Sequence, residues 1–382
     1  MEQLNAPKKV KILAYFLPQF HAIPENDMWW GEGFTEWTNV KKENRLSENL
    51  QPLNDNYYNL LEEETVLWQT KLAKQYGVYG FVYYHYYFCG KKLLEKPAEN
   101  LLKNKSIKQK FCFCWANHSW NRSWHGSREL LQEQKYGNEA EWSEHFDYLL
   151  PFFRDERYIK VNNKPLFVVY DGNFKEKEAI YKLFNKNARK NGFDGVFFTE
   201  SLYNTEQVKY ISNNLEAVTI REPFFSRILY QHNSFIRCIN KINRIRNKIR
   251  YSLLKIFKFK FLLLKYNGNK MIKRIVRNSR DLCKDMRSKG VKCWLGAFSN
   301  WDNTSRHGFR GYKITSISDK NYIWYLTELK KIAEQEDMEY IFFNAWNEWA
   351  EGMILEPDTR NGYRFLEGIK KVFGSDNFTE VV

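Results

Sequence analysis

Two glutamates stand three residues apart in a tryptophan-rich stretch, Asn344-Ala345-Trp346-Asn347-Glu348-Trp349-Ala350-Glu351. On a helical turn, this spacing places both side chains on one side, with Cβ atoms about 5–6 Å apart. Two carboxylates this close cannot both ionise freely, so we expect one pKa to rise and the other to stay low. A proton donor beside a base is what chemistry at a glycosidic bond requires. The plain alternative is the start of a surface helix, where the helix dipole favours acidic side chains.

Eight apolar runs, rich in β-branched and aromatic residues, divide the chain at intervals. Each run is continuous rather than alternating, which is typical of parallel strands covered on both faces. The runs are residues 10–16, 80–86, 111–115, 166–170, 196–199, 217–220, 293–298 and 340–343. Helical patterns separate most of them, the clearest at 62–76, 139–150, 175–190, 270–289 and 321–334, and 363–372 follows the last run.

Strand alternating with helix predicts a parallel sheet, and eight such units predict a closed (β/α)8 TIM-like barrel, with residues 1–382 as one domain. A doubly wound open sheet is the alternative, but no G-x-G-x-x-G follows the first strand. In a barrel, catalytic groups gather after the C-terminal ends of the strands. Side chains suited to this follow every predicted strand, although each alone could simply satisfy backbone groups. They are Gln19 and His21, His85, Asn117 and His118, Asp171, Glu200, Arg221 and Glu222, Trp301 and Asp302, and finally Asn344, Trp346, Asn347, Glu348 and Glu351.

Aromatic residues make up 17% of the chain, and the tryptophans follow the same geography. An indole covers the C–H face of a pyranose while short polar side chains bond its hydroxyls. We therefore expect a sugar-binding hollow at the barrel mouth, with core packing as the alternative for each tryptophan alone. Ten of the 13 lie in or near the first, third, seventh and eighth strands and their loops: Trp29, Trp30, Trp37, Trp115, Trp120, Trp124, Trp294, Trp301, Trp346 and Trp349.

One segment carries the whole excess of the +15 net charge. Residues 227–280 hold 16 Lys and Arg and no Asp or Glu, while the rest of the chain holds 44 basic and 45 acidic residues. A neutral body disfavours nucleic acid as the partner. Residues 249–265 interleave basic and large apolar side chains, which is typical of an amphipathic segment on an anionic membrane surface. The alternative is a basic, mostly helical insertion, residues 224–280 between the sixth and seventh strands, packed on the barrel.

The remaining features of the sequence concern the cellular compartment. No run of 18 apolar residues predicts a membrane-spanning helix, and the first nine residues lack the apolar core of a secretory signal. The six cysteines form no C-x-x-C pair, which favours buried thiols in a reducing compartment over disulfides or a zinc site. We expect a cytoplasmic protein, peripheral at the inner membrane face if the basic segment binds lipid, with no metal and no cofactor.

Long motifs spread over nearly the whole chain give a family resemblance. They are YFLPQFH at 15–21, WWGEGFTEWTNV at 29–40, YGVYGF at 76–81 leading into YYHY at 83–86, WAN at 115–117, YLLP at 148–151 with FR at 153–154, KPLF at 164–167, and NAWNEWAEGMILEPD at 344–358. With these motifs the chain resembles the WbsX-type polysaccharide-biosynthesis proteins, a branch similar to glycoside hydrolase family 99. The resemblance implies a (β/α)8 barrel, metal-independent catalysis and a glycan substrate.

The resemblance also implies roles for the two glutamates. In the family 99 enzymes, the first acid of an E-W-x-E stretch deprotonates the sugar's own 2-hydroxyl, which attacks the anomeric carbon to give a 1,2-anhydro sugar. The second acid protonates the leaving oxygen and then activates the incoming nucleophile. Carried over, Glu348 is the base and Glu351 the acid/base. The residues expected to bind substrate are Gln19, His21, Trp29, Trp30, Glu36, Trp37, Tyr84, His85, Trp115, Asn117, Glu222, Trp301, Asp302, Trp346 and Asn347.

The chain departs from the family pattern in three places. Ala350 stands where the mannan-cleaving enzymes have His, and His118-Ser119 follows Asn117 where the family usually has Glu. The segment 227–280 is longer and more basic than a barrel alone needs. Ala350 predicts altered sugar contacts, and the loss of the acid after Asn117 predicts a different glycan or an impaired site.

Three functions are compatible with such a site. We favour glycosyl transfer in biosynthesis of an O-antigen or capsule type of polysaccharide, on a lipid-linked oligosaccharide at the inner face of a membrane. The absence of any D-x-D motif disfavours the common metal-dependent nucleotide-sugar transferases. An endo-glycosidase or transglycosylase of the family 99 type is the second function, and a non-catalytic glycan-binding protein is the third.

Overall fold

The computed structural model describes residues 9–41, 50–122, 129–213, 215–229, 252, 264–307 and 311–374. Eight parallel strands form a closed barrel, in the order β1-β15-β12-β10-β9-β8-β4-β2, and β2 also pairs with β1, so the ring of strands is continuous. The strands are β1 (Lys11–Phe16), β2 (Val78–Phe88), β4 (Lys110–Trp115), β8 (Lys164–Val169), β9 (Phe197–Leu202), β10 (Ala217–Ile220), β12 (Lys292–Phe298) and β15 (Tyr340–Asn344). Each contains or overlaps one of the eight predicted runs, so the predicted barrel is confirmed.

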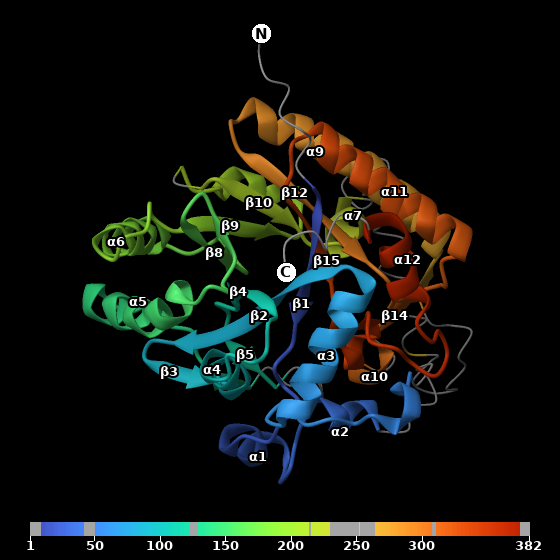
Figure 1. Cartoon of the computed structure of the whole chain (residues 1–382), viewed down its shortest axis with the longest axis horizontal. Helices are drawn as coiled ribbons and strands as arrows, with labels where there is room; N and C mark the ends of the chain where they lie inside the picture. The colour runs from blue at the N-terminus through green and yellow to red at the C-terminus, as the bar shows by residue number, and fades with distance from the viewer. Residues whose placement is uncertain are drawn as a thin grey trace.

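Helices surround the barrel, as Figure 1 shows for α3, α5, α6, α9, α11 and α12. These are α3 (Glu63–Tyr76), α5 (Glu139–Arg154), α6 (Lys177–Lys190), α9 (Gly268–Ser288), α11 (Asp319–Gln335) and α12 (Arg364–Phe373), and they confirm the six helical patterns. Two crossovers that showed little helical pattern hold the short α4 (Lys96–Lys103) and the 3-10 helix η3 (Thr205–Tyr210). Because helices cover the outer face and side chains fill the interior, the strands are buried along almost their whole length.

Short elements extend the loops. They are α1 (Pro24–Trp30), α2 (Glu36–Val40), η1 (Leu53–Asp55), β3 (Lys91–Leu93), β5 (Trp120–Asn121), β6 (Leu130–Gln132), β7 (Lys160–Val161), α7 (Phe224–Leu229), β11 (Leu264–Tyr266), β13 (Trp301–Asp302), α10 (Thr304–His307), β14 (Tyr312–Ile314), β16 (Asn347–Glu348), η6 (Trp349–Glu351) and β17 (Met353–Ile354). Several of them follow the C-terminal ends of strands, so the loops there carry structure of their own.

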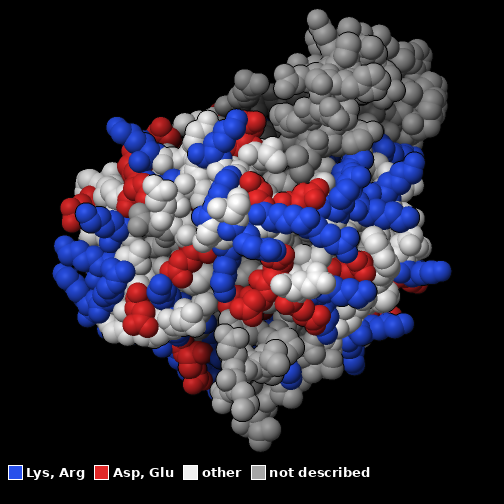
Figure 2. All heavy atoms as spheres, turned by 90° about the horizontal axis from the view of Figure 1, so that it is seen from above, with Lys and Arg blue, Asp and Glu red and all other residues white. Residues whose placement is uncertain are grey.

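The basic segment predicted at 227–280 lies partly outside the described residues, because 230–251 and 253–263 are not among them. Its last part is α9, a barrel helix that packs on β12 and α11. Arg280 and Arg287 of α9 form ion pairs with Glu328 and Glu336. Figure 2 views the molecule from the side where α9 lies at the top of Figure 1, and it shows basic and acidic side chains mixed on this face.

No helix within the described ranges is long and apolar enough to cross a membrane.

Candidate active site

A cavity of about 470 Å³ lies where the C-terminal ends of the barrel strands meet. This is the end of the barrel at which enzymes of this fold carry their chemistry. Its lining combines aromatic side chains with carboxylates, guanidinium groups and amides. The residues are Leu17, Gln19, Asn26, Trp30, Tyr84, Tyr86, Ala116, His118, Ser119, Trp120, Asn121, Leu131, Tyr170, Arg221, Phe224, Arg306, Glu348, Glu351 and Met353.

Glu348 and Glu351 both open into this cavity from one tight turn. Glu348 ends β16, which pairs with β17 so that Glu348 stands opposite Met353. The 3-10 turn η6 follows and ends at Gly352, whose φ of 60° is the left-handed conformation that glycine adopts without strain. Glu348 is the residue directly before this 3-10 turn and Glu351 is its last residue, so the two side chains line one cavity although the turn is not α-helical.

Arg306 ties Glu351 to a third carboxylate. Its Nη1 atom lies 2.6 Å from Glu351 Oε1, and its Nη2 atom lies 3.1 and 3.3 Å from the two oxygens of Glu36. Glu36 begins α2 and is completely buried, and it also accepts the backbone N–H of Ala350 at 3.1 Å. Burial raises the pKa of Glu36, and Arg306 opposes that rise. The ion pairs therefore join α2, α10 and the η6 turn.

The position of Arg306 depends on the loop after β12. Asp302 accepts the backbone N–H and the hydroxyl of Thr304 at 3.0 and 2.5 Å, which caps the single turn of α10. Ser305 then donates a hydrogen bond to the carbonyl of Ala350. The short helix is thus fastened directly onto the turn that carries both glutamates.

Glu348 has a different environment from its neighbour. It is 8% exposed, and no described group donates a hydrogen bond to its carboxyl. Burial, followed by the charge of Glu351, raises the pKa of Glu348 to about 8, against the opposing charges of Arg306 and Arg221. A buried carboxyl without a donor prefers the neutral form.

Arg221 forms a buried cation at the cavity wall, directly after β10. It is 2% exposed, and its guanidinium lies 3.7 Å from the ring centre of Tyr15 and 5.3 to 5.6 Å from those of Tyr170, Tyr84 and Tyr203. It donates a hydrogen bond to the Tyr84 hydroxyl at 2.5 Å. Within the described ranges, no carboxylate forms an ion pair with it, so aromatic faces take the place of a counter-ion.

The structure brings six of the predicted site residues together. Glu348, Glu351, Gln19, Trp30 and Tyr84 line the cavity, and Glu36 reaches it through Arg306. His118, where the family pattern has Glu, also lines the cavity and lies 4.9 Å from the ring of Tyr170. Partial desolvation at the cavity wall lowers the pKa of His118, against the opposing charge of Asp171, although its side chain remains exposed to solvent.

Several other predicted residues are buried beneath the turn that carries Glu348 and Glu351. Trp346 is completely buried, with its ring 4.8 Å from that of Phe81. Trp37 donates its indole N–H to the carbonyl of Tyr58 at 2.8 Å and packs against Trp349. Asn347 bonds the backbone of Leu17. The buried Glu356 accepts hydrogen bonds from Tyr58, Gln69 and Trp349 beneath them.

Three further predicted residues, Asn117, His85 and Trp115, connect neighbouring elements of the barrel. Asn117 donates to the carbonyl of Asp171 at 2.7 Å and accepts its N–H at 2.8 Å, which links the loops after β4 and β8. His85 points away from the cavity, with Nε2 2.9 Å from Nε2 of His145 on α5. Trp115 packs against the same histidine and donates to the carbonyl of Tyr87.

The last predicted residues lie beside the cavity. Glu222 accepts both the hydroxyl and the N–H of Ser226 in α7, and burial raises the pKa of Glu222 to about 7. Trp301 is buried against Tyr312. Burial lowers the pKa of His21 to about 4. Trp29 is 8% exposed and meets Trp120 edge to face.

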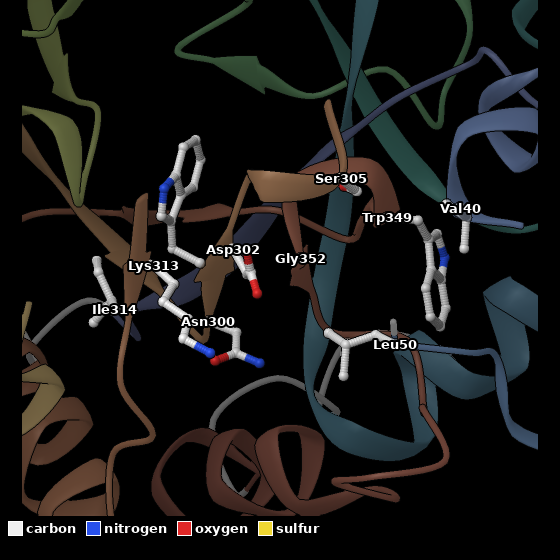
Figure 3. A pocket seen from close by; sticks show the side chains of 10 residues that line it. Val40, Leu50, Asn300, Asp302, Ser305, Lys313, Ile314, Trp349 and Gly352 are labelled. Carbon is white, nitrogen blue, oxygen red and sulfur yellow. The ribbon is translucent and has the colours of Figure 1, made fainter. Parts of the chain in front are cut away.

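Asp302 and Trp301 also line a second, much smaller hollow of about 30 Å³. Figure 3 shows Asp302, Asn300 and Lys313 on one side of it and Trp349 with Leu50 and Val40 on the other. A hollow of this size holds little more than a water molecule. The larger cavity is therefore the candidate active site.

Among the described residues, no group of three or more His, Cys, Asp or Glu is arranged to hold a metal ion.

Comparison with known families identifies the chain. The model of the family described as Glycosyltransferase WbsX matches residues 12–369. The chain belongs to this family. Among curated proteins, it is 29% identical over 374 residues to the uncharacterized protein WxcX of two strains of Xanthomonas campestris pv. campestris. The match covers 94% of this chain and 49% of WxcX, so the chain spans about half the length of these relatives.

Solved structures similar to this WbsX-family chain share its fold. A GH99 endo-alpha-mannosidase from Bacteroides thetaiotaomicron has a TM-score of 0.56 at 13% identity, covering 96% of this chain and 97% of that one. A glycoside hydrolase-like protein has a TM-score of 0.58 at 11% identity, covering 97% of both chains. At these identities the likeness concerns the barrel and its elaborations.

Sequence reasoning missed several residues that line the cavity of this WbsX-family protein. Tyr86 could have been found, because it lies two residues after Tyr84 on β2 and therefore on the same face. Arg221 directly follows a predicted strand, and this position alone does not indicate that its side chain lines the cavity. Arg306 has no signal of this kind, because it is 270 residues from Glu36 and belongs to no motif.

Proposed function

We propose that this protein transfers glycosyl groups in the biosynthesis of an O-antigen or capsule type of polysaccharide, without a metal ion. The observation that carries the proposal is the placement of Glu348 and Glu351 on one turn, both open to the same aromatic-lined cavity. Membership of the glycosyltransferase WbsX family supports the same reaction.

The cavity lining contains both kinds of group that bind a sugar, aromatic rings and hydrogen-bonding side chains. Trp30 and Trp120 supply flat apolar faces for the C–H side of a pyranose, and Gln19, Asn121 and Tyr84 supply hydroxyl-bonding groups. The two glutamates then handle the protons: one carboxyl group donates to the leaving oxygen while the other accepts from an attacking hydroxyl. General acid–base catalysis of this kind contributes about 10²–10⁴-fold in rate.

An endo-glycosidase or transglycosylase is the second candidate. The fold likeness to a GH99 endo-alpha-mannosidase, over nearly the whole of both chains, favours it. The two candidates differ only in the acceptor, since water gives cleavage and a sugar hydroxyl gives transfer. The same cavity serves both.

A product analysis separates the candidates. The full chain is incubated with a panel of lipid-diphosphate-linked oligosaccharides, with and without added acceptor glycans, and products are read by mass. Transfer predicts a product longer by sugar units only when acceptor is present. Cleavage predicts shortened products without it. Glycan binding with no product from any substrate would leave a non-catalytic binding protein.

Variants test whether the pair performs the reaction. We expect Glu351→Gln to lower turnover by about 10²–10⁴-fold while glycan binding remains. Glu64→Gln is the matched control, because Glu64 is an exposed residue at the start of α3. Full turnover by Glu351→Gln would end the proposal for the pair.

We also propose that the protein works in the cytoplasm and meets a lipid-linked substrate at an anionic membrane surface. The charge of 227–280 supports this, since each basic residue near such a surface contributes about 1 kcal/mol.

Liposome flotation tests the membrane proposal. Deleting 227–280 would remove most of α9 and damage the barrel, so the lysines and arginines at 241–260 are replaced by Gln instead. Flotation with anionic vesicles should fall in this variant and be weak with neutral vesicles for both proteins. Equal flotation of both proteins with anionic vesicles would contradict the proposal.

A further inference from the structure

At the candidate site lie three carboxyl groups, and one guanidinium contacts two of them. Arg306 touches Glu351 at 2.6 Å and Glu36 at 3.1 Å, and Glu36 has the additional N–H of Ala350. Glu348 opens into the same cavity with no donor to its carboxyl among the described groups. The contacts therefore distinguish the three carboxyl groups sharply.

The energetic consequence follows from burial. An ionised carboxyl that leaves water needs a cation or several hydrogen-bond donors, and otherwise it takes up a proton. Glu351 has the cation and Glu36 has the cation and a backbone donor, while no cation or donor among the described residues contacts the Glu348 carboxyl. A third negative charge beside the first two would also be repelled by both.

We propose that Arg306 is a positioning residue that holds Glu351 as the ionised member of the pair, so that Glu348 carries the proton and donates it to the leaving oxygen. This inference rests on the proposed function and deepens it. It is the reverse of the roles that the resemblance to family 99 implies, in which Glu348 is the base.

The step balances without a further reactant. The proton of the Glu348 carboxyl moves to the glycosidic oxygen as the bond from that oxygen to the anomeric carbon breaks. The hydroxyl that forms the new bond to the anomeric carbon gives its proton to the Glu351 carboxylate. After one turnover Glu348 is ionised and Glu351 is protonated, and proton exchange with solvent through the open cavity restores the starting state.

Other charged and titratable groups face the pair from every side, and they do not alter the assignment. Arg221 lies after β10, too far for an ion pair with Glu348, and it lowers the pKa of Glu348 only against larger opposing effects. Burial lowers the pKa of His307 on α10, which leaves its ring neutral. His118 also lines the cavity, and desolvation lowers its pKa. Four described tyrosines nearby have pKa values raised by burial: Tyr84 and Tyr86 on β2, Tyr170 after β8, and Tyr312 on β14.

Carbon-13 NMR of the glutamate side-chain carboxyls tests the charge assignment without any substrate. Signals of Glu36, Glu348 and Glu351 are assigned from the three single Gln variants and then followed by pH titration of the unsubstituted protein. We expect the Glu348 signal to change from acid to carboxylate near pH 8. Because Glu351 and Glu36 both contact the Arg306 guanidinium, the proposal expects carboxylate shifts for these two at neutral pH. A protonated Glu351 or Glu36 beside an ionised Glu348 at neutral pH would overturn the proposal.

Arg306 itself is tested by the same signals. In Arg306→Met, the Glu351 signal should acquire acid character at neutral pH, and Arg306→Lys should restore the carboxylate shift. Arg277→Met, an exposed change on α9, should leave the spectrum unchanged. An unchanged Glu351 signal in folded Arg306→Met would contradict the positioning role. Near-ultraviolet circular dichroism shows whether this variant folds. If it does not fold, Arg306→Lys and the titration of the unsubstituted protein still test the charge assignment.

Turnover separates failure of this inference from failure of the proposed function. A glycosyl fluoride of the transferred sugar needs no proton donor for departure, so Glu348→Gln should lose the natural reaction but use the fluoride. If Glu351→Gln uses the fluoride and Glu348→Gln does not, the roles are those of family 99 and the inference is overturned. If the unsubstituted protein turns over no glycan, the proposed function fails, while the NMR result still decides the charge assignment.

Discussion

The side-chain amide of Asn347 makes two hydrogen bonds with the backbone of Leu17. Its Nδ2 donates to the Leu17 carbonyl at 3.0 Å and its Oδ1 accepts the Leu17 N–H at 2.8 Å. Leu17 follows the first barrel strand and Asn347 follows the last, so the amide fastens the seam where the barrel closes. Glu348 is the next residue, and its position depends on this seam.

Loss of this amide should therefore destabilise the fold. Asn347→Ala leaves two buried backbone groups of Leu17 without partners, which costs about 1–3 kcal/mol for each group. We expect the free energy of unfolding, measured by urea denaturation, to fall by about 2–4 kcal/mol. Asn187→Ala on the outer helix α6 is the control and should change it by less than about 0.5 kcal/mol. A comparably small effect of Asn347→Ala would show that the seam does not need the amide.

The barrel could be predicted from the sequence because its signals are local. Runs such as 10–16 and 111–115 are continuous and apolar, and this pattern is typical of strands with both faces covered. The helices have their own periodicity between the runs. The crossover after β9 could not be predicted, because among its described residues the helical element is the 3-10 helix η3, which is too short to show a helical repeat.

The candidate site could be predicted only where it follows strand ends or motifs. Glu348 and Glu351 stand in one motif, and their common side follows from their spacing. Arg306 could not be predicted, because its contacts with Glu36 arise from three-dimensional packing across 270 residues. The placement of the tryptophans could not be predicted either. Composition does not distinguish a buried indole, such as that of Trp346, from one that faces a cavity.

The buried Glu222 should make stability depend on pH. Burial raises its pKa from the usual 4.5 to about 7, so the folded chain holds a proton that the unfolded chain releases as the pH rises between these values. The free energy of unfolding should therefore fall by up to about 3 kcal/mol between about pH 4.5 and 7 because of this group, and change no further above that range.

Glu222→Gln isolates this effect. A glutamine amide cannot ionise, so the stability curve of the variant should be flatter over the same range, as measured by denaturation at a series of pH values. Glu64→Gln, which changes an exposed carboxyl, should leave the slope of the curve unaltered. The assignment is wrong if both variants follow the unsubstituted protein.

The two cavity tryptophans should contribute binding energy rather than stability. Trp30 and Trp120 are half-buried at the cavity, and a sugar stacked on either indole would cover its exposed face. We expect Trp30→Ala and Trp120→Ala each to weaken glycan binding by about tenfold, or about 1.4 kcal/mol, in isothermal calorimetry. Trp324→Ala, on α11 and 37% exposed, is the control and should bind normally. Unweakened binding by both cavity variants would place the sugar elsewhere.

Arg221 offers a test that separates stability from electrostatics. No carboxylate in the described part of the chain contacts the buried Arg221 guanidinium, and a cation in that state gains little net stability from burial. Arg221→Met, with a side chain of similar length, should therefore leave the free energy of unfolding unchanged or raise it. The same change removes a positive charge that lowers the pKa of Glu348, so that pKa should rise above about 8. Carboxyl NMR should show this as a shift of the Glu348 titration to higher pH, with the Glu351 signal unaltered. Strong destabilisation of Arg221→Met would mean that contacts between the guanidinium and the surrounding tyrosine rings stabilise the barrel. An unchanged Glu348 titration would mean that the charge of Arg221 does not affect the pKa of Glu348.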